Sequence, residues 1–411
     1  MSSIDRYMEE LEARPWMHME QNVCPKCFTD DGIRKYIKNH ASEKKCDYCG
    51  KSSKRNIAMP LSELMDHIVG RICEEYSDPN NAGVMYISRE GGWQINTIDN
   101  QDLLINLDIT DNDSLLNDMA DNMYDDVWCD KRPYETKYGD QCKTLWLLFC
   151  SQVKHQTRFM FLNTQSTEPR NEDLHYFKEP YEILEVIGQY IIEGDVINTI
   201  DIGTKFIRAR ANIDSDFTDK PYNEVSQLCS PPAHLSCDGR MNPKGISMFY
   251  CAKEEKTALE EIKIKDKPNT HATVATFENV KELQILDFTK FKGIPSLFGD
   301  KYQLRQISIF INKFINEISQ PYTKSSKVDI EYIPTQIVTE FIFQILSLNG
   351  VKIHGIAYSS ARNPNGTCYV FNADMHYFKG ACNTSDGEQQ TWFHLISDSI
   401  KLTLLDNDSL S

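Results

Sequence analysis

The chain has 411 residues, of which 40% are hydrophobic and 25% are charged, and its formal net charge at pH 7 is −16. This length predicts two or three domains, and the acidic charge argues against nucleic-acid binding, which needs a basic surface. No apolar run approaches the ~18 residues of a membrane-spanning helix, and the N-terminus has charges where a signal peptide needs an apolar core, so we expect a cytoplasmic protein.

Two cysteine knuckles follow a short helix predicted at residues 4–18. They are Cys24-Pro25-Lys26-Cys27 and, after eighteen further residues, Cys46-Asp47-Tyr48-Cys49. Each Cys-x-x-Cys turn presents two sulfurs, and two such turns complete a tetrahedron around a metal. We therefore predict one structural zinc bound by Cys24, Cys27, Cys46 and Cys49, with no open position for a catalytic water. The thirteen cysteines of the chain form no dense framework, which fits a reducing cytosol.

Between the knuckles, Arg34 and His40 stand six positions apart. They resemble the Arg-x(4–6)-His signature of HEPN ribonucleases, in which both side chains act on the same phosphodiester. So short a pattern arises easily by chance, and here it lies inside a zinc loop rather than on a long helix. We favour a solvated basic helix face and keep ribonuclease activity as an alternative.

Residues 58–194 are predicted to be mainly helical. Apolar residues recur at helical spacing within 58–95, before a turn at Asp78-Pro79-Asn80-Asn81, and again within 97–130. The second segment contains ten Asp and no Lys, Arg or Glu, but it lacks the central Gly and terminal Glu of an EF-hand loop in register. We predict solvated helix faces there and leave open a docking surface for a basic partner.

Several further elements are predicted from their apolar patterns. Residues 145–151 and 158–162 fit either a strand or a buried helix, the polar residues 165–174 suggest a boundary region, and 181–192 predicts a helix closed by Gly194. In the C-terminal half, the predicted strands are 204–209, 247–252, 272–276, 283–287, 354–360 and 367–371, the last two around a turn at 363–366. The predicted helices are 303–318 and 335–347, the second with Pro334 at its start and Gly350 beyond its end.

The stretch from Gly239 to Ile262 carries the candidate chemistry. It passes from a glycine-bounded loop into a short apolar strand and then into a charged helix, so Tyr250 ends a strand and Glu261 lies on the following helix. An aromatic ring beside a carboxylate suits a substrate with a flat cationic ring and a bond whose cleavage leaves positive charge. At about 100° per residue, Glu261 lies at the edge of the buried helix face, whereas Glu260 points towards solvent.

Three motifs in order resemble the RES-domain family. They are Phe206-Ile207-Arg208-Ala209-Arg210, the run GRMNPKGISMFYCAKEEKTALEEI at 239–262, and Gly355-Ile356-Ala357-Tyr358-Ser359-Ser360-Ala361-Arg362. The resemblance covers roughly the last half of the chain. It implies a toxin that destroys NAD, on a fold similar to the diphtheria-toxin-like ADP-ribosyltransferases. The cysteine knuckles resemble the zinc-bearing domain found ahead of both HEPN and RES effectors.

The resemblance also implies a catalytic set made of Arg208, Tyr250, Glu261 and Ser360. Arg208 would hold the pyrophosphate as a bidentate donor, and Tyr250 would face the pyridinium ring. Glu261 would stabilise the cation that develops on the ribose, and Ser360 would hydrogen-bond the amide or a ribose hydroxyl. Arg240, in the loop before the strand, is a further candidate for the phosphates.

Two choices stay open at this point. Arg208 and Arg210 lie on the same side of a strand, although the family's arginine is the first of such a pair. Ser359 and Ser360 lie on opposite faces of a strand end, and the Tyr-x-Ser form of the motif favours Ser360. Ala209 departs from the family, whose members often carry an aromatic residue there, so part of the stacking arrangement is in question.

We therefore predict an α+β protein with three domains. Residues 1–57 would form an N-terminal helix and zinc module, 58–194 a mainly helical accessory domain, and 195–411 an α/β RES-like domain with an ADP-ribosyltransferase-like split sheet. The implied function is an NAD glycohydrolase or phosphorylase that depletes cellular NAD as a toxin or antiviral effector, under control of an antitoxin or regulatory protein. A HEPN-type ribonuclease and a non-enzymatic zinc-stabilised binding protein are the alternatives. The sequence leaves open a homo-oligomer and the acceptor of ADP-ribose, which could be water, phosphate or a protein.

Overall fold

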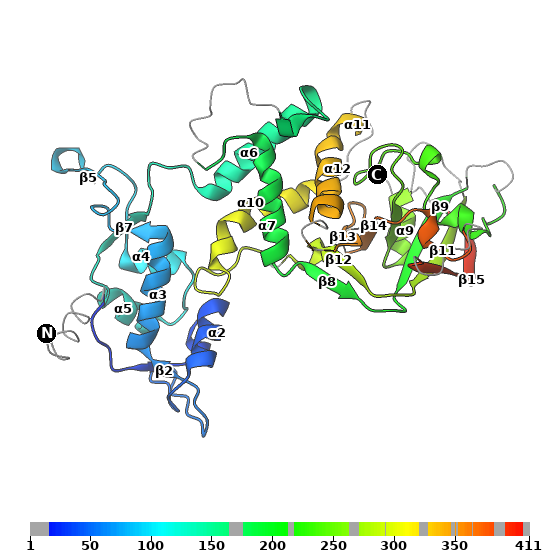
Figure 1. The fold of residues 1–411 in the computed structure, drawn as a ribbon. Helices are drawn as coiled ribbons and strands as arrows, with labels where there is room; N and C mark the ends of the chain where they lie inside the picture. Colours follow the sequence, from blue (N-terminus) through cyan, green and yellow to red (C-terminus); the bar gives the residue numbers. More distant parts are fainter. Residues whose placement is uncertain are drawn as a thin grey trace. The chain divides into compact units, whose positions relative to one another are not determined.

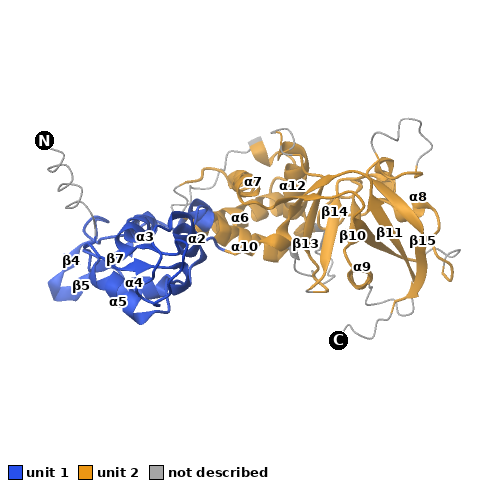
Figure 2. Cartoon of the chain, turned by 90° about the horizontal axis from the view of Figure 1, so that it is seen from below, with its two compact units in different colours: residues 1–137, 294–306 blue, residues 138–293, 307–411 orange. Residues whose placement is uncertain are grey.

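The structure is a computed structural model that describes residues 16–163, 176–212, 218–262, 271–291, 293–319, 328–346, 350, 352–363, 365–381 and 391–405. It divides into two compact units (Figure 2). Unit 1 contains residues 1–137 and 294–306, and unit 2 contains residues 138–293 and 307–411. The domain boundaries predicted after residues 57 and 194 fall inside these units and stay predictions about independent folding. The predicted helix 4–18, apart from its last three residues, and the segment 165–174 lie outside the described residues.

Unit 1 is mainly helical with several short strands (Figure 1). Its helices are α2 (Asp31–His40), α3 (Leu61–Glu75), α4 (Asn100–Asn106) and α5 (Asp113–Asp121). Its strands are β1 (Asn22–Val23), β2 (Met59–Pro60), β3 (Tyr76–Ser77), β4 (Tyr86–Ile87), β5 (Gly92–Trp93), β6 (Ile98–Asp99) and β7 (Val127–Asp130). They pair as β1-β2, β4-β5 and β3-β7-β6.

The acidic segment folds as the helical spacing predicted. Leu103, Leu104 and Leu115 are fully buried in the core of unit 1. The acidic and amide side chains that precede α4 and α5 have a structural role, because Asp99 accepts a hydrogen bond from the backbone N–H of Asp102, as helix N-caps do. Polar residues therefore start these helices while the apolar ones pack inward.

The segment Ile294–Gln306 belongs to unit 1 although it lies far along the chain. Leu297 and Phe298 are almost fully buried in the unit 1 core. The carbonyl of Phe298 contacts the His67 ring at 2.8 Å, and Arg305 pairs with Glu75 at 3.1 Å. The chain thus leaves unit 2 and returns to it through a buried segment of unit 1.

Unit 2 combines helices with a large mixed sheet (Figure 1). Its helices are α6 (Tyr138–His155), α7 (Ile183–Glu193), α8 (Val225–Leu228), α9 (Glu255–Ile262), α10 (Arg305–Ser319), α11 (Val328–Glu331) and α12 (Ile333–Glu340), which continues as a π-helical turn at Phe341–Ile345. The first two residues of α10 still belong to unit 1. The apolar run 145–151 lies in α6, so it forms a buried helix and not a strand. Pro334 stands in the first turn of α12, as predicted.

In the part of unit 2 that the structure describes, eight strands form the sheet, in the order β15-β11-β9-β10-β14-β13-β12-β8. They are β8 (Ile197–Ile200), β9 (Lys205–Ala211), β10 (Phe249–Ala252), β11 (His271–Asn279), β12 (Leu283–Asp287), β13 (Gly355–Ser359), β14 (Thr367–Phe371) and β15 (Phe393–Leu404). All neighbouring pairs are antiparallel except β12 and β13, which run parallel. This confirms the six predicted strands and adds the two edge strands β8 and β15.

The elements β9, β10 and α9 carry the candidate residues Arg208, Tyr250 and Glu261, and they pack against one another. Phe249 and Phe277 are fully buried and meet edge to face at 5.1 Å between ring centroids, in the sheet core. On α9, Thr257 and Ala258 are buried, and the helix packs against β9 and β10. Within the described residues, no helix is both long and apolar enough to cross a bilayer.

Candidate active site and candidate metal centre

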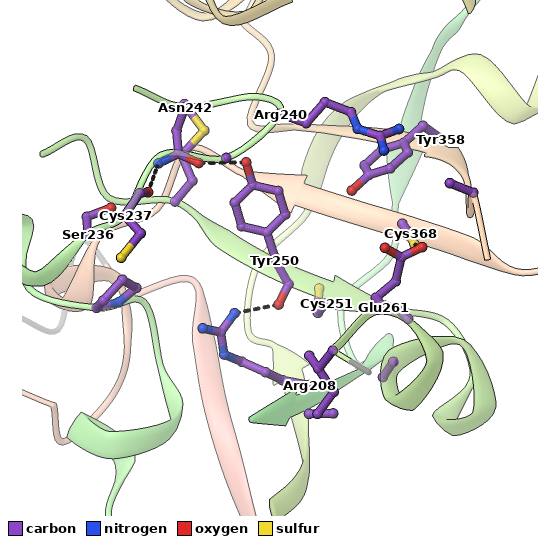
Figure 3. A pocket seen from close by; sticks show the side chains of 18 of the residues that line it. Arg208, Ser236, Cys237, Arg240, Asn242, Tyr250, Cys251, Glu261, Tyr358 and Cys368 are labelled. Atoms are coloured by element: carbon purple, nitrogen blue, oxygen red, sulfur yellow. Dashed lines mark hydrogen bonds between the residues drawn. The ribbon is translucent and has the colours of Figure 1, made fainter. Parts of the chain in front are cut away.

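A cavity of about 510 Å³ in unit 2 collects most of the predicted site residues (Figure 3). Its floor is formed by residues of the neighbouring strands β9, β10, β14 and β13. One wall is the loop of residues 235–242, and another is α9. Arg208, Arg240, Tyr250 and Glu261 all line it. Segments more than fifty residues apart in sequence therefore meet at one place.

Arg208 enters the cavity from β9. One of its terminal nitrogens donates to the carbonyl oxygen of Tyr250 at 2.6 Å, while its Nε is buried and has no hydrogen-bond partner. Among the described residues, no carboxylate lies within ion-pair distance of this guanidinium. Burial lowers the pKa of Arg208. A half-buried cation that lacks an anionic partner among the described residues favours an anionic ligand.

Arg210 has a different environment, although it is only two residues further along the same strand. Its guanidinium lies over the Tyr222 ring, 4.4 Å from the centroid, and donates to the carbonyl of Gln227. It is not part of the cavity lining. The geometry therefore favours Arg208 over Arg210 as the ligand-binding arginine.

Tyr250 presents its ring to the cavity, while its hydroxyl is used by the protein. The hydroxyl donates to Asn242 Oδ1 at 2.7 Å and accepts from the backbone N–H of Met241 at 3.2 Å. Burial raises the pKa of Tyr250, so the phenol stays protonated and keeps its donor role. These contacts suit an aromatic face for a ligand better than an acid or base.

Glu261 is held by two neutral donors. The Ser360 hydroxyl donates to its Oε1 at 2.5 Å, and the Cys368 thiol contacts the same oxygen at 3.6 Å. Burial, reinforced by the charge of Glu261, raises the pKa of Cys368, so this thiol stays protonated. Both contacts fall on Oε1, and among the described residues no donor is recorded for Oε2, which leaves that oxygen for a ligand.

Glu260 differs in part from the prediction that it faces solvent. It is half-buried, and its carbonyl oxygen accepts from Arg362 at 2.9 Å. Its side chain is not part of the cavity lining, whereas that of Glu261 is. The short helix leaves Glu260 beside neighbouring chain rather than fully exposed, but the two glutamates remain distinct.

Ser360 lies behind the cavity wall rather than in it. Its side chain is 5% exposed, and besides donating to Glu261 it accepts from the backbone N–H groups of Arg362 and Asn363. Ser359 is the last residue of β13 and pairs with Thr367. Of the two serines, Ser360 makes the recorded contact with the glutamate.

Other residues of the cavity escaped the sequence reasoning. Tyr358 and Cys368 stand opposite each other in the β13–β14 register, and Asn242 is buried beside Tyr250. Arg240 is close enough to Tyr358 and Cys368 for its charge to act against the rise in the pKa of each. Asn242 and Tyr358 could have been singled out, since the first stands inside the glycine-bounded loop and the second is the tyrosine of the Tyr-x-Ser motif.

The four predicted zinc ligands come together in unit 1. All their sulfurs lie within 4.8 Å of one another, with separations of 3.9 Å for Cys24–Cys27, 3.5 Å for Cys24–Cys49 and 3.6 Å for Cys27–Cys46. Four sulfurs at about 2.3 Å from a tetrahedral zinc would be about 3.8 Å apart. Burial raises the pKa of Cys24 and Cys27, so a cation would be needed to hold them as thiolates. The four cysteines could bind a metal ion.

Arg34 and His40 do not converge. Both lie on α2, where six residues correspond to about 240° of rotation and so to different faces. Arg34 pairs with Asp31 at 3.4 Å. The His40 ring contacts the carbonyl of Tyr36 and stacks on its ring at 4.2 Å. These contacts fit a helix surface.

Comparison with known families agrees with this arrangement. A model of the HEPN/RES N-terminal domain 1 matches residues 39–167, and a model of the RES domain matches residues 208–392. No curated protein matches the chain. The second match begins at Arg208 and includes Tyr250, Glu261 and Ser360. The chain therefore carries a RES domain behind a HEPN/RES N-terminal domain 1, as its motifs predicted.

Proposed function

We propose that this protein degrades NAD by breaking the bond between nicotinamide and ribose, in the cavity of unit 2. RES domains are generally associated with NAD-related toxins. The observation that supports the proposal best is the presence of opposite charges in that one cavity. Arg208 has a buried Nε without a partner and no carboxylate within ion-pair distance among the described residues. Glu261 is a carboxylate with one oxygen fixed and the other available. NAD has matching parts, an anionic diphosphate and a carbon that becomes cationic.

The diphosphate would be bound by arginine. Arg208 has one buried nitrogen without a partner, and a guanidinium can donate two parallel hydrogen bonds to phosphate oxygens. Arg240 lines the same cavity from the opposite loop. A diphosphate bound here would be a counterion for Arg208, which has no carboxylate partner among the described residues.

The nicotinamide ring would face Tyr250. The pyridinium is a flat cation, and an aromatic face attracts such a ring. Because the Tyr250 hydroxyl is bonded to Asn242 and Met241, the ring orientation is fixed before the ligand arrives. The strand residue thus provides a surface and takes no part in proton transfer.

The chemical step would depend on Glu261. As the C1′–nitrogen bond breaks, its electron pair moves to nicotinamide, which becomes neutral, and positive charge develops on the ribose. The carboxylate next to that carbon would stabilise the charge, with Ser360 holding Oε1 in place. An acceptor hydroxyl then bonds to C1′ and releases its proton. If the acceptor is water the product is ADP-ribose, and if it is phosphate the product is ADP-ribose 1″-phosphate.

The wider role follows from this reaction. Loss of NAD would stop growth, so the protein would be a cytoplasmic toxin or antiviral effector, restrained by an antitoxin or regulatory protein. The strand order of unit 2, with its mixed eight-stranded sheet, would correspond to an ADP-ribosyltransferase-like fold. In unit 1, Cys24, Cys27, Cys46 and Cys49 would hold a structural zinc.

One experiment separates this function from its rivals. The purified full-length protein is incubated with NAD, in buffer with and without phosphate, and separately with RNA, and the products are identified by mass spectrometry. We expect nicotinamide with ADP-ribose or its 1″-phosphate, and intact RNA. RNA cleavage with intact NAD would favour the ribonuclease, and no change in either substrate would favour a non-enzymatic binding protein.

A further inference from the structure

The loop that forms one wall of the cavity is fastened by side-chain amides. Its part from Cys237 to Ile246, here loop 237–246, extends beyond the residues that line the cavity and contains Arg240, which is one of them. A loop of this length loses considerable conformational entropy when it is fixed. Hydrogen bonds to its backbone carbonyls offset this cost and hold the loop in one conformation.

Asn242 supplies the first set of bonds, from inside the loop. Its side chain is 2% exposed, and its Nδ2 lies 3.0 Å from the carbonyl of Cys237 and 2.8 Å from that of Ile246. These two carbonyls belong to the two ends of the loop. The Oδ1 of the same amide accepts the hydroxyl proton of Tyr250. One amide thus closes the loop and ties it to the tyrosine of the site.

Helix α12 supplies the second set, from outside the loop. The Nε2 of Gln336 donates to the carbonyl of Gly239 at 2.8 Å and to that of Asn242 at 3.0 Å. The hydroxyl of Thr335 shares its one proton between the carbonyl of Arg240 at 2.7 Å and that of Tyr332 at 2.9 Å. Three carbonyls around the arginine are therefore bound by two adjacent residues of one helix.

The residues inside the loop are closely packed around Gly239. A Cβ added at Gly239 would lie 2.6 Å from Asn242 Oδ1 and 2.9 Å from the Tyr250 hydroxyl. Only glycine allows the amide, the phenol and the backbone to approach so closely. The bonds of Asn242 and Gln336 therefore belong to one tightly packed arrangement.

We propose that Asn242, Thr335 and Gln336 are positioning residues that fix loop 237–246, so that Arg240 and the Tyr250 ring are preorganised for the substrate. This rests on the proposed function, because it assigns the clamp to binding of NAD. Neither amide reaches Glu261 in the recorded contacts. The clamp should therefore govern how tightly the substrate is bound and affect the bond-breaking step much less.

The test uses isosteric changes on α12 of the full-length protein. Gln336→Glu keeps the size of the side chain but replaces its donor by an acceptor, and Thr335→Val removes only a hydroxyl. We expect each to raise the KM for NAD about three- to tenfold, as the loss of one or two hydrogen bonds implies, with kcat nearly unchanged. Thr335→Ser, which keeps the hydroxyl, is the matched control and should behave as the parent does.

Hydrogen exchange gives a second readout that does not depend on catalysis. Amide protons of residues 237–246 should exchange faster in Gln336→Glu and Thr335→Val, while those of β11 keep the protection they have in the parent. Unchanged exchange in the loop of both variants, or a loss of kcat at constant KM, would overturn the clamp. If Gln336→Glu fails to fold, Thr335→Val decides alone. A parent that consumes no NAD defeats the proposed function, and the exchange data then judge the clamp by themselves.

Discussion

At the scale of single residues, the site depends on which of two similar neighbours meets the rest of the fold. The strand period places Arg208 and Arg210 on one side of β9, and nothing local separates them. The structure separates them because the guanidinium of Arg210 contacts the Tyr222 ring and donates to the carbonyl of Gln227, whereas Arg208 lines the cavity. Likewise, Ser360 is distinguished from Ser359 by a bond to a glutamate 99 residues away. Such choices depend on long-range contacts, so strand geometry alone left them open, and only the resemblance to the RES family favoured Arg208 and Ser360.

The glutamates give the sharpest residue-scale prediction. Glu261→Gln keeps the size of the side chain but removes the charge opposite the developing ribosyl cation, so kcat should fall about a hundred- to a thousandfold. KM should change far less, because the ground-state ribose carries no charge at that carbon. The measurement is the steady-state rate of NAD consumption.

The control for this change is Glu260→Gln, whose side chain does not line the cavity. Its carbonyl bond to Arg362 involves the backbone and survives the substitution. We expect activity close to that of the parent. If Glu260→Gln were the inactive variant, or if both stayed active, the assignment of the carboxylate would be wrong.

The two arginines give a second prediction. Arg208→Lys keeps a positive charge but loses the planar fork that can grip a diphosphate, and the KM for NAD should rise about tenfold or more, since hydrogen bonds to charged groups are worth more than neutral ones. Arg210→Lys, on the same strand, should leave KM unchanged and lower only the melting temperature, because it loses its position over the Tyr222 ring. Equal effects on KM would contradict the choice of Arg208.

At the scale of elements, the sequence pattern predicted the bounds of regular strands but missed a strand that a bulge interrupts. The strands β12 and β14, whose sequences contain no turn-forming run, have the predicted bounds. The edge strand β15 was missed because Ser397-Asp398-Ser399 interrupts it like a turn. The structure accommodates this interruption as a register shift opposite Ala275, where the Ser399 hydroxyl accepts from the backbone N–H of Thr276.

His354, at the entry to β13, gives a prediction for the pH dependence of unfolding. Burial, together with the charges of Lys352 and Lys281, lowers the pKa of His354 to about 4, and its Nδ1 accepts from the backbone N–H of Gln284. The ring is therefore neutral when folded. Below its unfolded pKa of about 6.5, the unfolded chain takes up the proton first, so stability falls as the pH drops.

The expected loss of unfolding free energy from His354 is about 3 kcal/mol between pH 6.5 and pH 4. His354→Asn keeps an acceptor for the Gln284 N–H but cannot titrate. Its unfolding free energy should start lower, because it fills less space, and then decline less steeply across this window. Denaturant titrations at several pH values measure both slopes, and parallel slopes would contradict the assignment.

At the scale of the whole molecule, the metal centre should stabilise one unit and not the other. Freshly purified, reduced protein should contain one zinc per chain, and a chelator or Cys27→Ser should unfold unit 1, since a structural zinc contributes folding free energy directly. Metal analysis and calorimetry measure both effects. Cys237→Ser changes an exposed cysteine of unit 2 and should leave the zinc content unchanged. Protein purified without metal would contradict the zinc centre.

The boundary predicted after residue 194 concerns the helices α6 and α7. In sequence, the helix α7 looks like the end of an accessory domain. In the structure its Gly188 packs closely against Phe341, since an added Cβ would lie 3.2 Å from the Phe341 ring. In α6, Lys154 pairs with Glu331 at 2.6 Å, and Trp146 donates to Glu317 at 2.7 Å. Because α6 and α7 cover the helices of unit 2, removing them would expose apolar surface.

Truncation tests this directly. A fragment of residues 138–411 keeps α6 and α7 and should fold, whereas a fragment of residues 195–411 lacks both and should be poorly soluble or melt at a lower temperature. Both fragments retain Leu297 and Phe298, which are buried in the core of unit 1, so each is also made with Leu297→Ser and Phe298→Ser to remove this shared liability. Solubility and thermal melting are compared within each pair. If residues 195–411 melted at the same temperature as residues 138–411, the boundary after residue 194 would mark an independently folding domain, and α6 and α7 would be accessory to it.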